Sequence, residues 1–418
     1  RPMIVLDAVA QERLLGRPVR AVLTEKDRQM FAGQRLLVTG AGGSVGSELA
    51  RQLAACGPAL LTLFDHAEYN LFRVERELRE AFPDVNIVAV LGDVSRRADV
   101  RAACRAARPH AVYHAAAYKH VPIAERSIVP AARTNVLGTV ETVAAAREVG
   151  ARFLLISSDK AAEPRSVMGA TKRLAELVAL SQASSTFRPI AVRFGNILGS
   201  SGSVVEIMLR CVQQGQPVPV TNPDATRFFM TAQEAVSLVL KADLIGRGGE
   251  VFWLDMGAPL RIGDLAQRLI DLATPAGASR VDVTIIGLRA GEKMREELTT
   301  QGLELRQTSH ARIWSARQRE VSRHVVTHAL RELRRASASG DALTALDAIT
   351  MAVADFEASD AAISAARAST LVALAPAAVA RPARSSQGVR GGQGVRNSQR
   401  GQRGQGVRNF TGRLGSRQ

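Results

Sequence analysis

The chain has 418 residues, of which 46% are hydrophobic and 22% are charged, and its formal net charge is +16. This composition excludes a wholly disordered chain and allows two or three domains with a sizeable core. No apolar run reaches the ~18 residues that a membrane span needs. The three cysteines are too few and too scattered to predict a disulfide framework or a metal site, which favours a reducing compartment.

The positive charge is concentrated at one end of the chain. Residues 381–418 contain nine Arg and no Lys, Asp or Glu, so they carry +9 and leave +7 for the rest. The sequence Gln-Gly-Val-Arg occurs three times in this region. We therefore expect residues 375–418 to form a disordered tail rich in Arg, Gly and Gln.

Taken in chain order, residues 1–32 are interpreted as a linker or the remnant of an upstream domain. From Gln34 onward, short apolar runs alternate with helical patterns. The runs predict strands at 35–39, 59–64, 86–91, 111–117, 152–157 and 190–194, and the segments between them predict helices at 47–56, 68–82, 99–107, 131–149 and 168–184. This alternation predicts an α/β fold with a doubly wound parallel sheet of the Rossmann type.

The alternation weakens after Gly195, and the expected domain organisation follows from that change. We expect a dinucleotide-binding domain at 33–200 and a smaller substrate-binding lobe at 201–310, with returning segments. Residues 311–370 are Ala-rich and predict a helical segment.

A glycine-rich loop follows the first expected strand and opens the first expected helix. Gly40, Gly43 and Gly46 let the backbone turn sharply and approach a diphosphate, which the N–H groups of the helix N-terminus would bind. Asp65 ends the second strand, where a carboxylate accepts from both ribose hydroxyls and repels a 2′-phosphate. Asp93 ends the third strand, within reach of an adenine amine. The loop therefore predicts a dinucleotide cofactor, NAD rather than NADP.

A catalytic segment is expected after the fifth strand, at the sheet edge where open parallel sheets bind ligands. Ser158, Asp159 and Lys160 lie there, an acid and a base side by side. Such a pair suits the dehydration of a hexose. Oxidation at C4 makes the C5 proton acidic, a base removes it while an acid protonates the leaving 6-hydroxyl, and the hydride returns to C6. Asp159 fits as the acid, and Lys160 fits as the base if its pKa is lowered.

Seven motifs, found in order, carry a family resemblance: TGAGGSVGSE (39–48), HAAAYKHVP (114–122), SSDKA (157–161), MGATKR (168–173), RFGNILGSSGSVV (193–205), ATRFFMT (225–231) and LRAGEK (288–293). With them the chain resembles the extended short-chain dehydrogenase/reductase superfamily. Within it, the chain is similar to bacterial capsular and O-antigen nucleotide-sugar 4,6-dehydratases that act on UDP-N-acetylglucosamine. The resemblance implies the same acid and base roles for Asp159 and Lys160, and it places Lys172 at the nicotinamide ribose.

One position departs from the wider superfamily, because Met168 stands where the catalytic Tyr is usual. A thioether is too weak an acceptor to take a proton. The superfamily branch with large membrane-anchored members resembles this chain in having Met there. Ser158, Asp159 or a water near Lys172 are the candidates for accepting the C4-hydroxyl proton, and Met168 either faces the core or lines the site.

The remaining expected site residues contact the substrate or the cofactor. Two guanidinium groups can clamp a diphosphate bidentately, and the resemblance places Arg227 and Arg289 near the UDP phosphates and Glu292 at the ribose. His114 is expected to be structural, and no metal site is expected. The substrate set is completed by Lys119, Asn196, Ser203, Val204 and Thr221, and the cofactor set by Ser44, Val45, Val94, Ala115 and Ala116.

Three functions stay open on the sequence. The first is a UDP-N-acetylhexosamine 4,6-dehydratase for surface-polysaccharide synthesis. The second is a nucleotide-sugar 4-epimerase or reductase, against which the Asp159–Lys160 pair and the missing Tyr argue. The third is a non-catalytic nucleotide- or RNA-binding protein, which only the basic tail supports.

The expected partners and location complete the interpretation. We expect a homo-oligomer with no specific nucleic-acid partner and a cytoplasmic location for the chain as given. Residues 1–32 resemble the junction that follows a membrane-anchored domain in long family members. A longer natural form would accordingly be anchored in the inner membrane.

Overall fold

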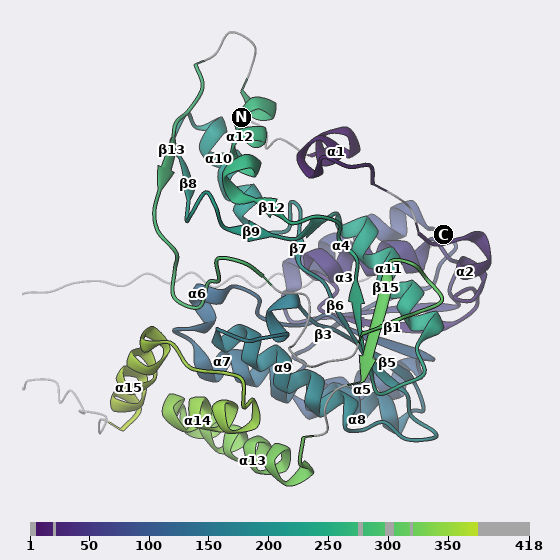
Figure 1. The fold of residues 1–418 in the computed structure, drawn as a ribbon. Helices are drawn as coiled ribbons and strands as arrows, with labels where there is room; N and C mark the ends of the chain where they lie inside the picture. Colours follow the sequence, from purple (N-terminus) through teal and green to yellow (C-terminus); the bar gives the residue numbers. More distant parts are fainter. Residues whose placement is uncertain (1–5, 20–21, 275–278, 297–304, 318–320, 375–418) are drawn as a thin grey trace, which may run out of the picture. The chain divides into compact units, whose positions relative to one another are not determined.

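A nine-stranded sheet forms the centre of the described chain (Figure 1). The structure is a computed structural model, and it describes residues 6–19, 22–274, 279–296, 305–317 and 321–374. The strand order is β14-β15-β11-β6-β5-β4-β1-β2-β3. The strands are β1 Arg35–Thr39, β2 Leu60–Asp65, β3 Ile87–Leu91, β4 Ala111–His114, β5 Arg152–Ile156, β6 Pro189–Arg193, β11 Glu250–Leu254, β14 Arg306–Gln307 and β15 Ile313–Arg317.

The strands from β3 to β11 are parallel, which confirms the expected doubly wound sheet. β15 runs antiparallel to β11, and β14 runs antiparallel to β15. β1 lies between β2 and β4, so the strand order reverses direction there. The carboxyl ends of strands at such a switch point diverge and leave a crevice for a ligand.

Helices cover both faces of the sheet, which is why its strands are nearly continuous apolar runs. One face packs on α3 (Ser44–Ala54), α4 (Glu68–Ala81) and α11 (Ala232–Ile245). The other packs on α5 (Arg97–Ala107), α8 (Gly138–Glu148) and α9 (Val167–Leu180). Each layer buries the apolar stripe of its helices against the sheet, so the two faces form two hydrophobic clusters.

A smaller lobe follows the sixth strand and has its own core. It contains α10 (Val204–Gln213), α12 (Ile262–Ala273) and three short strand pairs. The pairs are β7 Asn196–Ile197 with β10 Phe229–Met230, β8 Val218–Val220 with β13 Val283–Ile285, and β9 Thr226–Arg227 with β12 Leu260–Arg261.

The amino-terminal segment is attached to both parts of the fold. α1 (Ala8–Leu15) buries Leu14 and Leu15 in the core of the smaller lobe. α2 (Glu25–Gln29) is tied to α11 by an ion pair in which Lys241 Nζ lies 2.6 Å from Asp27 Oδ1. Residues 6–19 and 22–32 therefore pack on the domain that follows them.

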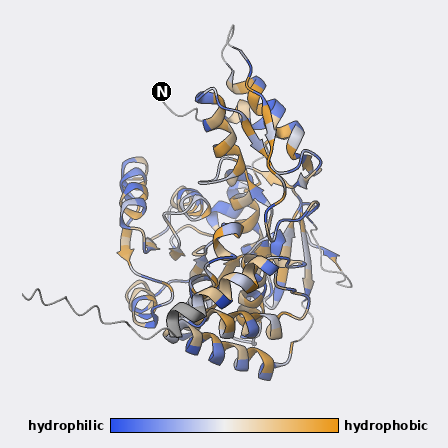
Figure 2. Cartoon of the chain, turned by 90° about the vertical axis from the view of Figure 1, so that its left-hand side faces the viewer, coloured by the Kyte–Doolittle hydropathy of each residue, from blue (hydrophilic) through white to orange (hydrophobic). Residues whose placement is uncertain are grey.

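Three carboxy-terminal helices pack beneath the helix that carries Lys172. They are α13 (Arg323–Ser339), α14 (Ala342–Ala352) and α15 (Asp360–Leu374), and they share a hydrophobic cluster with α7 (Ile128–Ala132) and α9. The apolar residues of α13 that face this cluster recur at helical spacing, with polar residues on the other side (Figure 2). This arrangement explains why all fourteen residues of α9 are buried.

Most sequence-based boundaries differ from the structure by a few residues, and three of the differences change the description of the fold. The strand expected at 111–117 ends at His114, because the residues after it line a cavity. The helix expected at 131–149 is interrupted by a π-helical turn at Arg133–Leu137, called η1. Residues 313–317 form β15 in the sheet, so the carboxy-terminal helical segment begins at Arg323 and not at 311. The expected tail at 375–418 lies outside the described residues.

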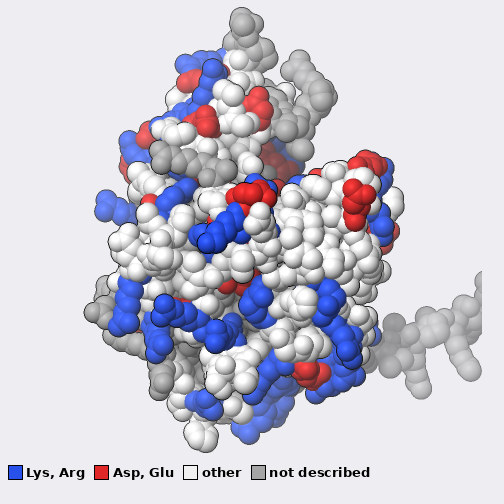
Figure 3. Space-filling view, turned by 90° about the vertical axis from the view of Figure 1, so that its right-hand side faces the viewer, with Lys and Arg blue, Asp and Glu red and all other residues white. Residues whose placement is uncertain are grey.

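Two surface properties bear on the expectations about partners. None of the helices in the described part of the chain has the length and apolarity to cross a bilayer. On the face drawn in Figure 3, Lys and Arg side chains gather over the lower part, and Asp and Glu lie mostly over the upper part. Many arginines are neutralised locally, as in the ion pairs of Arg51 with Glu77 and of Arg152 with Asp243.

The packing of α14 yields a stability prediction with a matched control. Ile349 is fully buried beneath α9 and α13, whereas Met351, two residues on, is 44% exposed. We expect Ile349→Ala to lower the free energy of unfolding by about 2–5 kcal/mol, because the truncation leaves a cavity. Met351→Ala should change it by less than about 0.5 kcal/mol. Urea unfolding followed by circular dichroism measures both, and equal effects would contradict the described packing.

Candidate functional site

The glycine loop between β1 and α3 is shaped by close backbone contacts. Gly40 has φ +67°, and a Cβ atom there would lie 2.6 Å from the backbone N of Ala116. A Cβ atom on Gly46 would overlap the carbonyl oxygen of Gly40. Only glycine fits at either position, and the loop therefore brings bare backbone N–H groups to the N-terminus of α3, where an anion is stabilised.

Asp65 fixes this loop against the next strand. Its Oδ2 accepts from Gly42 N at 2.8 Å, and its Oδ1 accepts from Ala67 N at 2.8 Å. The side chain is 6% exposed and still borders the cavity described next. The carboxylate therefore positions the loop, and it keeps acceptor capacity for a ligand hydroxyl.

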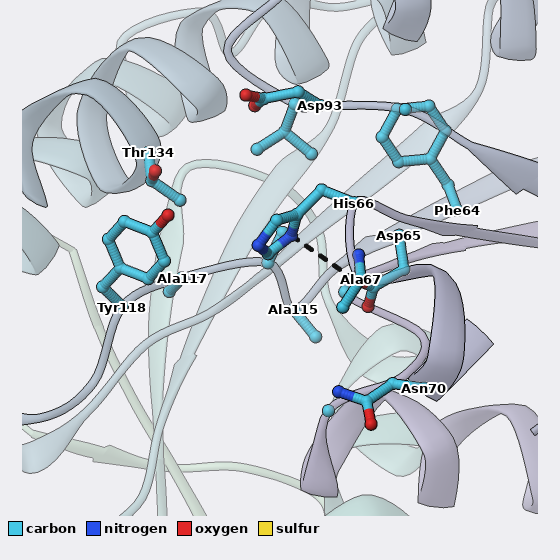
Figure 4. Close-up of a pocket in the computed structure, with 15 residues that line it drawn as sticks. Phe64, Asp65, His66, Ala67, Asn70, Asp93, Ala115, Ala117, Tyr118 and Thr134 are labelled. Atoms are coloured by element: carbon cyan, nitrogen blue, oxygen red, sulfur yellow. Dashed lines mark hydrogen bonds and ion pairs between the residues drawn. The ribbon is translucent and has the colours of Figure 1, made fainter. Parts of the chain in front are cut away.

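A cavity of about 160 Å³ opens between the glycine loop and the ends of β2, β3 and β4 (Figure 4). It contains seven of the residues expected to bind a cofactor: Gly40, Gly43, Asp65, Asp93, Val94, Ala115 and Ala116. Ser44, Val45 and Gly46 form the first turn of α3 beside it. Asp93 uses one oxygen to accept from the backbone and hydroxyl of Ser95, so part of its acceptor capacity is spent locally.

The cavity also brings in residues that the sequence analysis did not select. His66 and Tyr118 approach each other edge to face with ring centroids 6.4 Å apart, and Asn70 and Thr134 lie on opposite sides (Figure 4). Tyr118 stands inside the motif HAAAYKHVP, which was the only sequence signal for it. His66 and Asn70 follow β2 without a motif.

The π-helical turn η1 connects this cavity to α9, the helix that carries Lys172. Asn135, on that turn, accepts from Tyr118 N at 2.7 Å and donates to Tyr118 O at 3.0 Å. Its amide also donates to Thr171 Oγ1 in α9 at 3.0 Å. π-Turns often occur at functional sites. Here the turn places the Asn135 amide so that it bonds to both Tyr118 and Thr171.

Asp159 and Lys160 lie together at the carboxyl end of β5, in the 3₁₀ turn η2 (Asp159–Ala161). Lys160 Nζ lies 3.2 Å from Asp159 Oδ1 and donates to Asn196 Oδ1 at 3.2 Å. The Asp159 side chain is fully buried, while that of Lys160 keeps about a quarter of its surface. Ser158 begins the turn, where its hydroxyl accepts from Lys160 N and donates to Asp159 Oδ1. The expected acid and base are therefore in contact.

Glu296 is an unpredicted member of this cluster. Its Oε1 lies 2.8 Å from Lys160 Nζ and 3.2 Å from Arg227 Nε, and its side chain is 6% exposed. A backbone bridge between Thr226 and Arg295 holds the segment beside β9. Glu296 stands three residues after the motif LRAGEK, so the sequence drew attention to its neighbourhood. Its partner Lys160 lies 136 positions earlier, and no sequence pattern linked the two.

The charges of the cluster set its protonation. Burial on its own would lower the pKa of Lys160, but the charges of Asp159 and Glu296 raise it above its ordinary value. Burial opposes ionisation of Asp159, yet the charge of Lys160 and the hydrogen bonds around it hold the Asp159 pKa below its usual value. Burial and then the charge of Asp159 raise the pKa of Glu296 to about 8. The expectation of a lowered Lys160 pKa is thus wrong for this arrangement, because two carboxyl groups hold the ammonium.

A second buried ionic network lies next to the turn η2 and supports it through Ser157. Glu176 of α9 accepts from Arg193 of β6 through both carboxylate oxygens, at 2.7 and 2.6 Å, and both side chains are fully buried. Ser157, which precedes the catalytic segment, donates to Glu176 Oε1 at 2.5 Å. The Arg193 guanidinium also stacks 4.9 Å from the ring centre of Trp253. This network joins β5, β6, α9 and β11 under the site.

Met168 and Lys172 share α9 but not the same surroundings. Met168 is 3% exposed and belongs to the cluster that includes α7 and α13, so its side chain packs in the core. Lys172 Nζ donates to Ile156 O at 2.5 Å, and burial lowers its pKa to about 8.

His114 forms hydrogen bonds with Thr39 and Thr139 through its two ring nitrogens. Burial lowers the His114 pKa to about 3, so this histidine is neutral and structural as expected.

The expected substrate residues occupy three places. Asn196 and Arg227 lie in the cluster around Lys160, where Arg227 also donates to Met294 O. Arg289 and Glu292 pair with each other in an exposed turn after β13. The remaining expected residues lie between β4 and the end of β8. Lys119 donates a hydrogen bond to Ser200, and Ser203 caps α10, which begins at Val204. Thr221 directly follows β8.

The loop at 199–203 connects these places to the glycine loop. Ser201 N donates to Ser44 Oγ at 3.1 Å, at the first turn of α3. A Cβ atom on Gly202 would lie 2.6 Å from the His120 ring. The loop therefore contacts the first turn of α3 on one side and Lys119 and His120 on the other. Among the described residues, no group of three His, Cys, Asp or Glu side chains is placed to hold a metal ion.

Residues 36–318 match the family described as "Polysaccharide biosynthesis protein". The chain belongs to this family. The capsular polysaccharide biosynthesis protein CapD of Staphylococcus aureus is 43% identical over 300 residues, which cover 70% of this chain and 49% of CapD. The chain thus spans about half the length of that relative. A UDP-glucose 4-epimerase of Rickettsia canadensis is 31% identical over 280 residues, covering 65% of this chain and 79% of the epimerase.

Solved structures share the fold of this chain. Pen from Bacillus thuringiensis superposes with a TM-score of 0.64 at 28% identity, covering 72% of this chain and 98% of Pen. The dTDP-glucose 4,6-dehydratase DesIV of Streptomyces venezuelae has a TM-score of 0.55 at 23% identity, over 64% of this chain and 88% of DesIV. The expected family of capsular polysaccharide biosynthesis proteins and the extended short-chain dehydrogenase/reductase fold are both confirmed.

The buried Lys172 yields a prediction about the pH dependence of stability. Its pKa is about 8 in the folded protein and near 10.5 when exposed, so between these values the unfolded chain binds more protons and stability rises with pH. We expect the free energy of unfolding of the parent chain, relative to Lys172→Met, to rise by at most about 1.4 kcal/mol per pH unit across this window. Urea unfolding at several pH values measures it, and a constant difference would show that Lys172 is not desolvated.

Proposed function

We propose that the chain dehydrates UDP-N-acetylglucosamine, or a related UDP-N-acetylhexosamine, to the 4-keto-6-deoxy sugar for surface-polysaccharide synthesis. The observation that carries the proposal is the buried contact between Asp159 and Lys160 at the carboxyl end of β5. An elimination across C5–C6 needs one group to remove a proton and another to protonate the leaving hydroxyl. Two adjacent titratable groups that are largely shielded from water meet that need.

The cavity residues fit a nicotinamide dinucleotide, which the proposal takes to be NAD. The backbone at Gly40 and Gly46 has no room for a Cβ atom, so the loop is open to a diphosphate at the N-terminus of α3. Asp65 borders the cavity with a carboxylate, which favours free ribose hydroxyls over a 2′-phosphate. When bound, NAD supplies hydride uptake at C4 and hydride return at C6.

The protein side chains then handle protons and position. Lys172 is held by the carbonyl of Ile156 and, with its lowered pKa, can change charge near neutral pH. Asn196 and Arg227 orient the Lys160–Glu296 contact. Asp159 would protonate the leaving 6-hydroxyl and Lys160 would remove the C5 proton. Both roles require a proton to move from Lys160 to Asp159 first, because the pKa directions place that proton on Lys160.

A second candidate is 4-epimerisation, which the similarity to the Rickettsia enzyme named UDP-glucose 4-epimerase favours. Epimerisation moves a proton only at the C4 oxygen. It would leave the buried Asp159–Lys160 pair without a substrate proton to transfer. The position usual for the proton-accepting Tyr is Met168, which packs in the core. We therefore rank dehydration first.

Mass spectrometry of UDP-N-acetylglucosamine incubated with the chain and NAD tests the proposal. We expect the loss of one water, reduced by about 10²–10⁴-fold in Asp159→Asn and in Lys160→Ala, because each removes a proton-transfer group. Lys26→Ala, a change in α2 away from the site, and deletion of residues 381–418 serve as controls that keep activity. An unchanged mass with a C4-epimerised product would establish the second candidate instead.

The cofactor expectation has its own test. Gly46→Ala places a methyl group against the Gly40 carbonyl and should reduce NAD binding at least tenfold. Isothermal titration calorimetry measures the affinity, and thermal unfolding in parallel shows whether the fold survives. Tight NAD binding by a folded Gly46→Ala variant would place the cofactor elsewhere, and tighter binding of NADP than NAD would contradict the role given to Asp65.

A further inference from the structure

Glu296 closes a buried cluster that contains two carboxyl groups and two cations. The charged groups that face it are Asp159 and Lys160 from η2 and Arg227 from β9. Both cations point at the same oxygen, Glu296 Oε1. The segment that carries Glu296 is fixed by the backbone bond from Thr226 N to Met294 O at 2.9 Å. The carboxyl group is therefore placed by strand pairing and not by an exposed side-chain contact.

The second oxygen of each carboxyl group bears on whether Asp159 or Glu296 is protonated. Asp159 Oδ2 and Glu296 Oε2 are both buried, and no N–H or O–H donor of the described residues reaches either. The two carboxyl groups are held close together, because Asp159 Oδ1 and Glu296 Oε1 lie 3.2 and 2.8 Å from the same Lys160 Nζ. Two ionised carboxylates in contact would repel each other, so one proton on the pair is the stable arrangement. The raised pKa of Glu296 assigns that proton to Glu296 near neutral pH.

We infer that Glu296 works in its protonated form as a positioning residue, which allows Lys160 to pass a proton to Asp159 and so creates the base and the acid of the dehydration. The inference rests on the proposed function. With Glu296 ionised, Lys160 is held as an ammonium between two negative charges. With Glu296 neutral, the proton can move along the contact from Lys160 Nζ to Asp159 Oδ1, and the desolvated amine is left as a base.

The proton balance of the step closes without a further reagent. The Lys160 amine takes the C5 proton while the Asp159 acid protonates O6, the C6–O bond breaks and water leaves. Asp159 is then a carboxylate and Lys160 an ammonium, which is the starting state. Over the whole cycle two protons leave the substrate, from O4 and C5, and two are delivered, to O6 and C5. Glu296 keeps its own proton throughout, which separates this role from that of a general acid.

The test is Glu296→Gln, which keeps the shape and hydrogen bonds of the neutral side chain but cannot ionise. Its amide oxygen can still accept from Lys160 and Arg227, and its amide N–H can donate to Asp159. We expect kcat for water loss at pH 7 within about threefold of the parent. Each pH unit above a pKa of about 8 lowers the neutral fraction of Glu296 about tenfold. The ratio of variant to parent kcat should therefore rise about thirtyfold between pH 7 and 9.5, with KM little changed.

Matched variants complete the experiment. Glu332→Gln removes a carboxylate of α13 that pairs with surface arginines, and its pH profile should follow that of the parent. Glu296→Ala leaves both cations without their shared acceptor and should lose activity at every pH. The titration of Lys172 is present in all these chains, so the comparison isolates Glu296. An inactive but folded Glu296→Gln, or parallel pH profiles for parent and variant, would overturn the inference.

A spectroscopic arm separates this inference from the proposed function. The infrared carbonyl band of a protonated carboxylic acid should be present in the parent at pH 7, titrate near pH 8 and be absent in Glu296→Gln. If the parent shows this band but removes no water from the substrate, the proposed function fails while the proton assignment stands. If no such band exists, Glu296 is ionised and the inference fails whatever the activity.

Discussion

The buried pair of Arg193 and Glu176 is the interaction on which the site depends most. Both side chains are fully buried, and the pair connects a strand of the sheet to the helix that carries Lys172. Removing one partner of such a pair costs about 3–5 kcal/mol, because the other charge is left in a medium that cannot solvate it. Ser157 also bonds to Glu176, so the residue before the catalytic turn is fixed to the same network. The turn therefore starts from a rigid base.

Next to this ion pair, the cluster of Asp159, Lys160, Arg227 and Glu296 combines charges that attract and charges that repel one another. Lys160 and Arg227 attract the carboxyl groups of Asp159 and Glu296, while the two carboxyl groups repel each other until they hold a proton. Burial strengthens all these effects, since few water molecules can screen them. The result is that the proton shared by Lys160 and Asp159 rests on Lys160, because the pKa of Lys160 is raised and that of Asp159 is lowered. The charges of Asp159 and Glu296 explain why the pKa of Lys160 is raised.

The amino-terminal helices, the smaller lobe and the carboxy-terminal helices stabilise this site by packing around it. The helices α13 and α14 bury the outer face of α9, and α1 and α2 attach the smaller lobe and α11 to the chain before β1. The smaller lobe in turn provides Arg227 and, through strand pairing, Glu296. Several basic groups of the described surface pair with acids, as Arg51 does with Glu77 and Arg101 with Glu148. The chemistry is thus concentrated at the edge of the sheet.

The sequence by itself determined the parallel sheet, the glycine loop and the nearness of Asp159 to Lys160. These features depend on local periodicity, on steric limits at glycine and on adjacency along the chain, all of which a sequence displays. Tertiary structure alone decided that Glu296 meets Lys160, that Met168 faces the core and that the Lys160 pKa rises. The π-turn at Asn135 and the strand β15 were likewise set by distant partners. Long-range contacts and desolvation arise only when the chain is packed, so no local pattern reports them.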